Sequence, residues 1–362
     1  MTDEKIAAWT LSGIDGVGPA VFVRLIERFG SASGVFGATL EEFRKLEIND
    51  HNLIQRIISD RNWDEFKLSL QKSIPDGASF VTFTESCYPS KLRNISNPPP
   101  FLYYRGDIGI FERPSLAIVG SRRPSDYGLR MASRIAGELA SAGVVIVSGL
   151  AYGVDGAAHQ AALDAGGTTA AVFGCGLDIV YPSGHRSLAA RIAESGCLLS
   201  EFPKGTRPER FNFPVRNRIV AGISDGVLVI EAGEKSGALV TAAIALEQNK
   251  DILALPGSVD NNLSYGPNNL IKQGAVTVTS AEDIFNNFGW HISKAVKEPS
   301  YDLSKLSRDE LAVFGLLSIQ PLHLDEIGRK AQLGPGKTAE ALLNLELKGY
   351  IMRKPGNFVV KA

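Results

Sequence analysis

Residues 116–147 read LAIVGSRRPSDYGLRMASRIAGELASAGVVIV, and this stretch decides the fold. An apolar run at Leu116–Val119 leads into a loop of small and polar residues. An Ala-rich helical pattern follows over Gly128–Ala142, and a second apolar run occupies Val144–Val147. Strand-like runs that alternate with helical patterns are typical of βαβ units, whose strands lie parallel in one sheet.

The same alternation continues to about residue 290. Further helical patterns lie at Val154–Ala165 and Leu239–Gln248. The further apolar runs are Thr169–Phe173, Cys197–Leu199, Gly226–Ile230, Asp251–Leu255 and Ala275–Val278. The repeated unit predicts an α/β fold with a doubly wound parallel sheet. We expect this domain to span residues 76–290, with residues 76–112 as an irregular lead-in marked by the proline run at 98–100.

Helical patterns flank the predicted sheet on the N-terminal side. Residues 1–75 predict a small helical domain in which Ile14–Pro19 supplies a Gly-x-Gly turn between two helices, a helix-hairpin-helix. The amides of such a turn and the following helix N-terminus can bind a phosphate. The alternative is a packing unit that contacts no ligand, and the acidic balance of this region favours it.

Residues 291–304 read as a linker, and residues 305–362 predict a winged-helix domain. Its helix-turn-helix would comprise Asp325–Ala331 and Lys337–Lys348, and its wing would comprise Ile351–Arg353 and Phe358–Val360. Duplex recognition requires cations that neutralise phosphates. The second helix carries two basic and two acidic residues, so it is poorly suited to recognise a DNA duplex. The alternative is that this domain contacts a protein.

Composition excludes several classes. The 362 residues are 44% hydrophobic, and 38 basic residues balance 39 acidic ones, so any polyanion site must be local. The three cysteines lack Cys-x-x-Cys spacing, which argues against a disulfide framework or a structural zinc site. Neither a signal-peptide pattern nor an apolar stretch of about 18 residues is found, so we expect a soluble, cytoplasmic protein without membrane contact.

The loops after the predicted strands share one sheet edge, where ligands of open parallel sheets bind. They are rich in glycine and serine, and several carry a cation. The residues we select from them are Gly120, Ser121, Arg122, Lys204, Lys235, Ser236 and Lys272. Small residues let a ligand approach bare backbone, and helix N-termini offer free N–H groups to an anion. These loops predict an anion site, unless the glycines serve only tight turns and close packing.

Residues 201–218 form the most basic stretch. Five cations interleave with Phe211 and Phe213 against two glutamates. Cations that follow a phosphate backbone, together with aromatic faces that stack on bases, are what a single-stranded nucleic acid requires. The alternative is a solvated loop whose phenylalanines fill the core.

Cofactor and catalytic patterns are not found in the sequence. The residues after the first strand, Gly120–Ser125, lack the Gly-x-Gly-x-x-Gly of dinucleotide sites. Gly336-Lys337-Thr338 imitates a P-loop, but Ala331 stands where its first glycine is required. Neither a nucleophile elbow nor metal-ligand spacing is present. We therefore predict no cofactor, no metal and no catalytic residues.

Six segments, in order, resemble the DNA-processing protein A family, DprA, also called Smf. They are AIVGSRRPSDYG (117–128), SGLAYGVDGAAHQAAL (148–163), GCGLDIVYPSGH (174–185), SEFPKGTRPERFNFPVRNRIVAGIS (200–224), EAGEKSGALVTAA (231–243) and LPGSVDNNLSYGPNNLIKQGA (255–275). The resemblance implies an extended Rossmann domain that binds single-stranded DNA, forms a homodimer and loads the RecA recombinase. It implies a role in natural transformation or homologous recombination, and no enzymatic activity.

The resemblance also implies the DNA pocket. Its Gly-Ser-Arg loop corresponds to residues 120–122. Its basic-aromatic segment corresponds to Arg210, Phe213, Arg216, Asn217 and Arg218. The other cations and Ser236 are our additions from charge and loop position. The alternative is a nucleotide phosphoribohydrolase-like enzyme of the same broad fold, but Thr241 stands where its catalytic carboxylate would lie.

Overall fold

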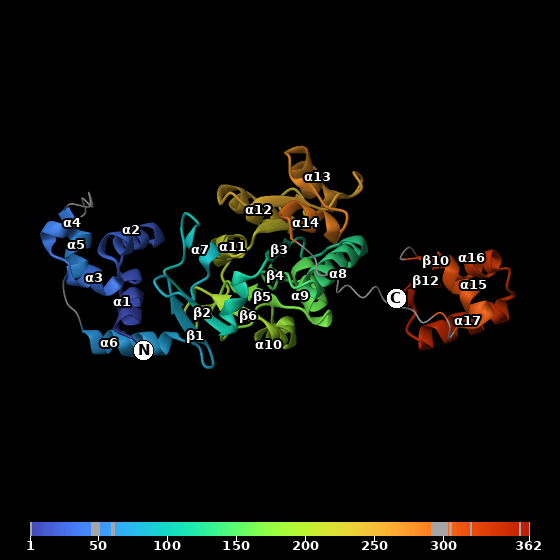
Figure 1. Ribbon diagram of the computed structural model, residues 1–362, viewed down its shortest axis with the longest axis horizontal. Coiled ribbons are helices and arrows are strands. Elements are labelled where there is room, and N and C mark those ends of the chain that lie inside the picture. The colour runs from blue at the N-terminus through green and yellow to red at the C-terminus, as the bar shows by residue number, and fades with distance from the viewer. Residues whose placement is uncertain are drawn as a thin grey trace. The chain divides into compact units, whose positions relative to one another are not determined.

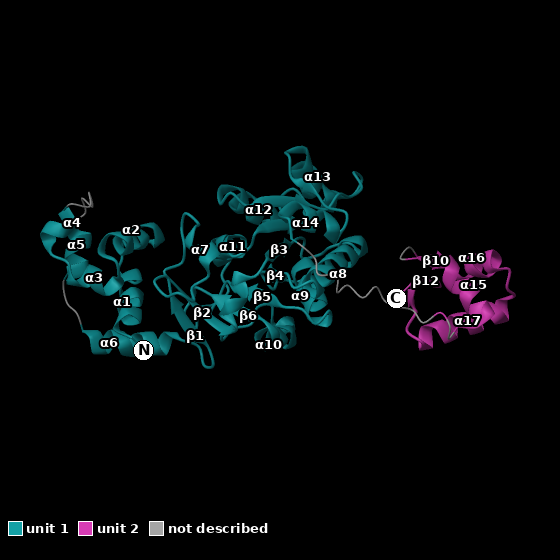
Figure 2. Ribbon diagram, viewed as in Figure 1, with its two compact units in different colours: residues 1–296 teal, residues 297–362 magenta. Residues whose placement is uncertain are grey.

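A computed structural model describes residues 2–44, 51–58, 62–290, 303, 306–318, 321–354 and 356–361. The chain divides into two compact units, residues 1–296 and residues 297–362 (Figure 2). The predicted linker at 291–304 lies outside the described residues except for Leu303. The predicted boundary near residue 75 falls inside the first unit and stays a prediction.

The first unit is built around one large sheet with helices packed about it (Figure 1). Among the residues that the structure describes, this sheet has nine strands. Its strands are β1 (Ser79–Thr82), β2 (Phe101–Gly106), β3 (Ser115–Val119), β4 (Val145–Ser148), β5 (Thr169–Val172), β6 (Cys197–Ser200), β7 (Gly226–Val229), β8 (Asp251–Ala254) and β9 (Val276–Thr277). The spatial order is β1-β2-β6-β5-β4-β3-β7-β8-β9, and β6 through β9 are all parallel in that order. The predicted doubly wound parallel sheet is confirmed, and each predicted apolar run overlaps one strand.

Helices cover both faces of this sheet. Alternate residues of β3 belong to different cores: Leu116 and Ile118 face one layer, whereas Ala117 and Val119 face the other. The first layer comprises α8 (Asp126–Ser141), α9 (Val154–Asp164), α10 (Arg186–Ser195) and α14 (Ala281–Phe288). The second comprises α7 (Ser90–Arg93), α11 (Asn212–Gly222), α12 (Gly237–Glu247) and α13 (Tyr265–Lys272). Burial on both sides explains why the strands are continuously apolar.

The prediction that residues 76–112 are irregular is wrong. β1 and β2 pair antiparallel with each other, and β2 adds antiparallel to β6 through Tyr103 opposite Ser200. The aromatic run Phe101–Tyr104 is a strand signal that directly follows the proline run at 98–100. The prolines end before the strand begins, so they mark its start rather than an extended connector.

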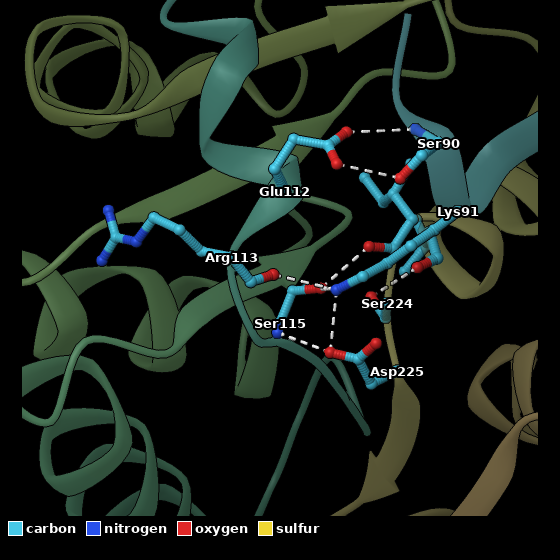
Figure 3. Close-up of polar contacts among 9 residues, drawn as sticks. Ser90, Lys91, Glu112, Arg113, Ser115, Ser224 and Asp225 are labelled. Carbon is cyan, nitrogen blue, oxygen red and sulfur yellow. Dashed lines mark hydrogen bonds and ion pairs between the residues drawn. The ribbon is translucent and has the colours of Figure 1, made fainter. Parts of the chain in front are cut away.

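A polar cluster fastens this added segment to the amino-terminal edge of the sheet (Figure 3). The Lys91 ammonium on α7 lies 2.8 Å from the Asp225 carboxylate and donates to the Ser115 hydroxyl and the Arg113 carbonyl, each at 2.9 Å. Asp225 also accepts the Ser115 backbone N–H at 2.9 Å. The cluster therefore joins α7, the start of β3 and the start of β7, at the edge opposite to the glycine-rich loops.

The N-terminal helices are α1 (Asp3–Ser12), α2 (Pro19–Phe29), α3 (Ala32–Gly37), α4 (Leu40–Arg44), α5 (His51–Ile58) and α6 (Trp63–Ser73). The first five share a core of their own, whereas α6 packs through Leu70 into the core that includes Tyr103 of the sheet. The predicted turn between two helices is present as residues 13–18, with Gly16 at φ +97°. Asp15 on this turn pairs with Arg56 at 3.2 Å. Phosphate binding by the turn stays a prediction.

Over its described residues, the second unit contains three α-helices and a three-stranded sheet. They are α15 (Arg308–Leu316), α16 (Leu324–Ala331), α17 (Pro335–Leu347), β10 (Leu322–His323), β11 (Ile351–Lys354) and β12 (Phe358–Lys361), with the sheet order β10-β12-β11. This arrangement confirms the predicted winged helix. Lys348, just after α17, pairs with Glu310 at 2.7 Å, and Leu343 and Leu347 are exposed on α17.

Candidate nucleic-acid interface

A cavity of about 940 Å³ opens at the carboxyl ends of β3, β4 and β7. The chain winds outward from β3 in one direction through β4 to β6, then returns to place β7 on the other side of β3. Ligands of open α/β sheets bind where the strand order reverses in this way. Nine of the twelve predicted site residues line the cavity: Gly120, Ser121, Arg122, Arg210, Phe213, Arg216, Asn217, Lys235 and Ser236.

The buried Glu231 carboxylate holds the Gly-Ser-Arg loop in place. It accepts the Ser125 N–H at 2.8 Å and the Ser125 hydroxyl at 2.5 Å, and the Glu231 carbonyl accepts the Ser121 N–H at 2.7 Å. A Cβ at Gly128 would lie 2.4 Å from this carboxylate, so only glycine fits at that point of α8. The sequence reasoning missed Glu231, although an acidic residue directly after the apolar run of β7 was a visible signal.

Phe213 presents an aromatic ring to the cavity, and two cations lie close to this ring. The guanidinium carbons of Arg122 and Arg216 lie 5.7 and 5.9 Å from the ring centroid. The Tyr181 ring lies 5.7 Å from it. Phe213 reaches this position from the first turn of α11, and a Cβ at Gly174 would come within 2.9 Å of its ring. Gly174 after β5 therefore makes room for the Phe213 side chain, and not for a ligand.

Arg216 is a buried cation beneath the cavity, only 5% exposed. Its Nη1 donates to the carbonyl of Gly149 at 2.9 Å and to that of Val172. Burial lowers the pKa of Arg216 to about 10, so the guanidinium stays charged at neutral pH. A Cβ at Gly149 would lie 2.4 Å from this group, which requires glycine there.

Asp155 is the buried acid of the same region. Its carboxylate accepts the N–H groups of Gly149 at 3.1 Å and Ala151 at 3.3 Å. Burial raises the pKa of Asp155, and the charge of Arg216 together with these hydrogen bonds acts in the opposite direction. The two groups therefore depend on each other electrostatically in a region shielded from water.

Cations and a helix N-terminus surround the cavity mouth. Arg122, Arg210 and Lys235 are exposed. Ser236 is the N-cap of α12, and its hydroxyl accepts the Ala238 N–H at 3.3 Å. Helix N-termini favour anions because their first N–H groups have no partners within the helix. The mouth can thus bind phosphate groups of a ligand, while the Phe213 ring can stack on an apolar face of the same ligand.

Three predicted residues do not line the cavity. Arg218 pairs with Glu201 away from the cavity, because residues two apart on a helix point to different sides. Lys204 lies 3.0 Å from the Asp76 carboxylate. Lys272 is exposed at the end of α13. Their contact with DNA stays a prediction.

Two further predictions concern metal ligands and membrane-spanning helices. Within the described residues, no group of three or more His, Cys, Asp or Glu side chains is placed to hold a metal ion. Among the helices that the structure describes, none is long and apolar enough to cross a bilayer.

His159, buried on α9, lies 2.7 Å from the Thr169 hydroxyl, and burial lowers its pKa to about 3. It is therefore a neutral, structural histidine.

The fold and cavity define an extended Rossmann-type protein with a polar cavity at its topological switch point, and the second unit is a winged helix. The sequence profile described as DNA recombination-mediator protein A matches residues 79–289, and that of the DprA winged helix domain matches residues 297–357. The chain belongs to the DNA recombination-mediator protein A family, DprA.

Curated relatives and solved structures agree with this assignment. Protein Smf of Synechocystis sp. is 35% identical, with 98% of each chain covered. Protein Smf of Escherichia coli is 41% identical over 75% of this chain and 74% of that one. The structure of DprA from Streptococcus pneumoniae matches with a TM-score of 0.68 and 34% identity, covering 80% of this chain and 99% of that one.

A second solved structure concerns a ligand. The DNA processing protein A of Helicobacter pylori, described for its single-stranded DNA binding mode, matches with a TM-score of 0.53 and 34% identity. The match covers 58% of this chain and 95% of that one.

Proposed function

We propose that this protein binds single-stranded DNA in the cavity at the carboxyl ends of β3, β4 and β7. One observation carries the proposal: the Phe213 ring lines a cavity with exposed cations at its mouth, and two guanidinium groups lie within 6 Å of the ring centroid. Stacking of bases on aromatic rings, combined with cations along the backbone, is the usual chemistry of single-strand binding. The single-stranded DNA binding described for the Helicobacter pylori relative supports it.

The geometry favours a single strand over a duplex. The Phe213 ring is only partly exposed and lies within the cavity, so a base must leave its stack to reach it. Arg122, Arg210 and Lys235 at the mouth, and the N-terminus of α12, then face the phosphates on either side of that base. Stacking does not distinguish one base from another strongly, so we expect little sequence preference.

We expect the protein to bind a single-stranded oligonucleotide more tightly than a duplex of the same sequence. Four to five phosphate contacts, each contributing roughly 0.7 to the slope, predict that log K falls with log salt concentration at a slope of about −3. Fluorescence anisotropy at several salt concentrations measures both quantities. Several unrelated sequences serve as controls. Equal or tighter duplex binding at moderate salt would contradict the proposal.

We further propose that the protein acts by binding and not by catalysis. The phosphoribohydrolase-like alternative needs a carboxylate at position 241, where the structure has the buried Thr241 hydroxyl beside the cavity. Relatives carry DNA-processing names. Release of the base from AMP by purified protein would support the enzyme instead.

The family resemblance supports two partner proposals that the fold alone does not carry. We propose a homodimer through the Rossmann domain, because two linked cavities on one strand would raise avidity. Light scattering of the full chain at micromolar concentration is expected to report twice the mass of 38.8 kDa. A strict monomer would contradict this proposal.

The second partner proposal is RecA. We propose that the protein protects single-stranded DNA during transformation or recombination and loads RecA onto it. The expected result is a shorter lag before RecA filaments form on single-stranded DNA when this protein is present. An unchanged lag would contradict RecA loading without affecting the DNA-binding proposal.

A further inference from the structure

A smaller hollow of about 40 Å³ adjoins the main cavity. It shares Arg122, Tyr181 and Phe213 with the cavity, whereas Tyr152 and Pro182 line only the smaller hollow. The side chains of Tyr152 and Tyr181 are large and aromatic, yet the residues are 50% and 45% exposed. Two exposed aromatic side chains beside a ligand cavity are a feature that core packing does not explain.

The backbone around Tyr152 is held in an unusual conformation. Leu150 is fully buried and has φ +58°, a left-handed conformation that a branched residue rarely adopts. Gly153 has φ +80°, and a Cβ there would lie 2.3 Å from the Ser121 carbonyl oxygen. The loop between β4 and α9 is therefore fixed from both sides while Tyr152 stays at the surface. Such backbone strain concentrates at ligand-binding sites.

Neighbouring groups also order the Tyr152 ring. Its ring packs edge-to-face on the His185 ring with centroids 4.9 Å apart. His185 Nδ1 lies 3.0 Å from the Leu150 carbonyl oxygen, which ties η2 (Ser183–His185) to the β4–α9 loop. A Cβ at Gly184 would lie 2.8 Å from the Tyr152 hydroxyl, so the ring sits directly over a residue without a side chain. An aromatic ring ordered in advance loses little conformational entropy when a ligand stacks on it.

We propose that Tyr152 and Tyr181 form a second nucleobase subsite, which takes the base adjacent to the one on Phe213. This inference rests on the proposed function. Arg122 lines both hollows, so its guanidinium is placed for the phosphate that joins the two nucleotides. The ligand class is a pair of consecutive bases of any identity, since aromatic stacking tolerates every base.

The test compares hexanucleotides that carry the same phosphates and different numbers of bases. One is fully abasic, one has a single thymine, and one has two adjacent thymines. With the full-length protein, the first thymine is expected to increase affinity through Phe213. The second thymine is expected to add about fivefold or more through the tyrosine pair. The Tyr152→Ser variant should keep the first gain and lose the second.

Two further variants make the result specific. Tyr265→Ser removes an aromatic residue of similar exposure, 51%, that lines neither hollow, and it should retain both gains. Tyr152→Phe should also retain both, because the ring and not the hydroxyl stacks. A second-thymine gain that is absent in the wild-type protein, or unchanged in Tyr152→Ser, would overturn the subsite. A single thymine that adds nothing in the wild type would instead overturn the proposed function.

Discussion

Replacing Arg216 with methionine is expected to lower the free energy of unfolding by about 3–5 kcal/mol, because two hydrogen bonds from a buried charged group are lost at about 1.5–3 kcal/mol each. Methionine fills a similar volume but leaves the carbonyls of Gly149 and Val172 without their donor. It also leaves the buried Asp155 carboxylate without the opposing charge that lowers its pKa. Urea unfolding at neutral pH measures the loss.

The loss in Arg216→Met should depend on pH with a definite sign. A carboxyl group whose pKa is raised in the folded state binds more protons there than in the unfolded state, so stability falls as pH rises through that interval. Burial raises the pKa of Asp155 already, and removing Arg216 raises it further. The difference in stability between variant and wild type should therefore be larger at about pH 8 than at about pH 5.

The matched control for Arg216 is Arg210→Met, on the same basic segment. Arg210 is exposed, and surface substitutions usually change stability by no more than about 0.5 kcal/mol. A second control is Arg216→Met combined with Asp155→Asn, which removes the unpaired buried charge and should recover part of the loss. If Arg216→Met unfolded like the wild type, the buried guanidinium would have no structural role.

The sequence predicted the parallel part of the sheet because each central strand is buried on both faces and so reads as an apolar run. β1 and β2 were not predicted, because the antiparallel edge that they form does not follow the βαβ alternation. The aromatic residues of β2 follow directly on the prolines at 98–100, which drew the interpretation towards a connector. Antiparallel edge strands on parallel sheets are common, and only the pairing of Tyr103 with Ser200 reveals this one.

Site residues were predictable as a set, but their individual roles were not. The prediction from sequence assigned Arg216 and Arg218 the same role. In the structure, Arg216 lies under the cavity, whereas Arg218 points towards Glu201. From the sequence, the main interpretation of the glycines at the strand ends is that they let a ligand approach the backbone closely. Gly149 instead makes room for Arg216, and Gly174 makes room for Phe213. These distinctions depend on which side chain packs against which glycine, and such packing has no local pattern in the sequence.

Phe213→Ala and Arg210→Ala are expected to weaken single-strand binding through different physics. Stacking of a base on an aromatic ring contributes about 1–3 kcal/mol, so Phe213→Ala should reduce affinity about tenfold or more. Its salt dependence should stay near that of the wild type, because no charge is removed. Arg210→Ala removes an exposed cation at the cavity mouth. It should reduce affinity and also flatten the salt slope by about 0.7 for each phosphate that the variant no longer neutralises.

A salt titration of both variants separates the two contributions, with melting curves to confirm that each variant folds. Lys272→Ala tests the predicted contact outside the cavity, since Lys272 is an exposed cation that does not line it. Binding like that of the wild type, with an unchanged slope, would contradict this contact. If Phe213→Ala and Arg210→Ala also bound like the wild type while folded, residues 201–218 would face away from the DNA. If Lys272→Ala flattened the slope as Arg210→Ala does, the strand would extend past the cavity to α13.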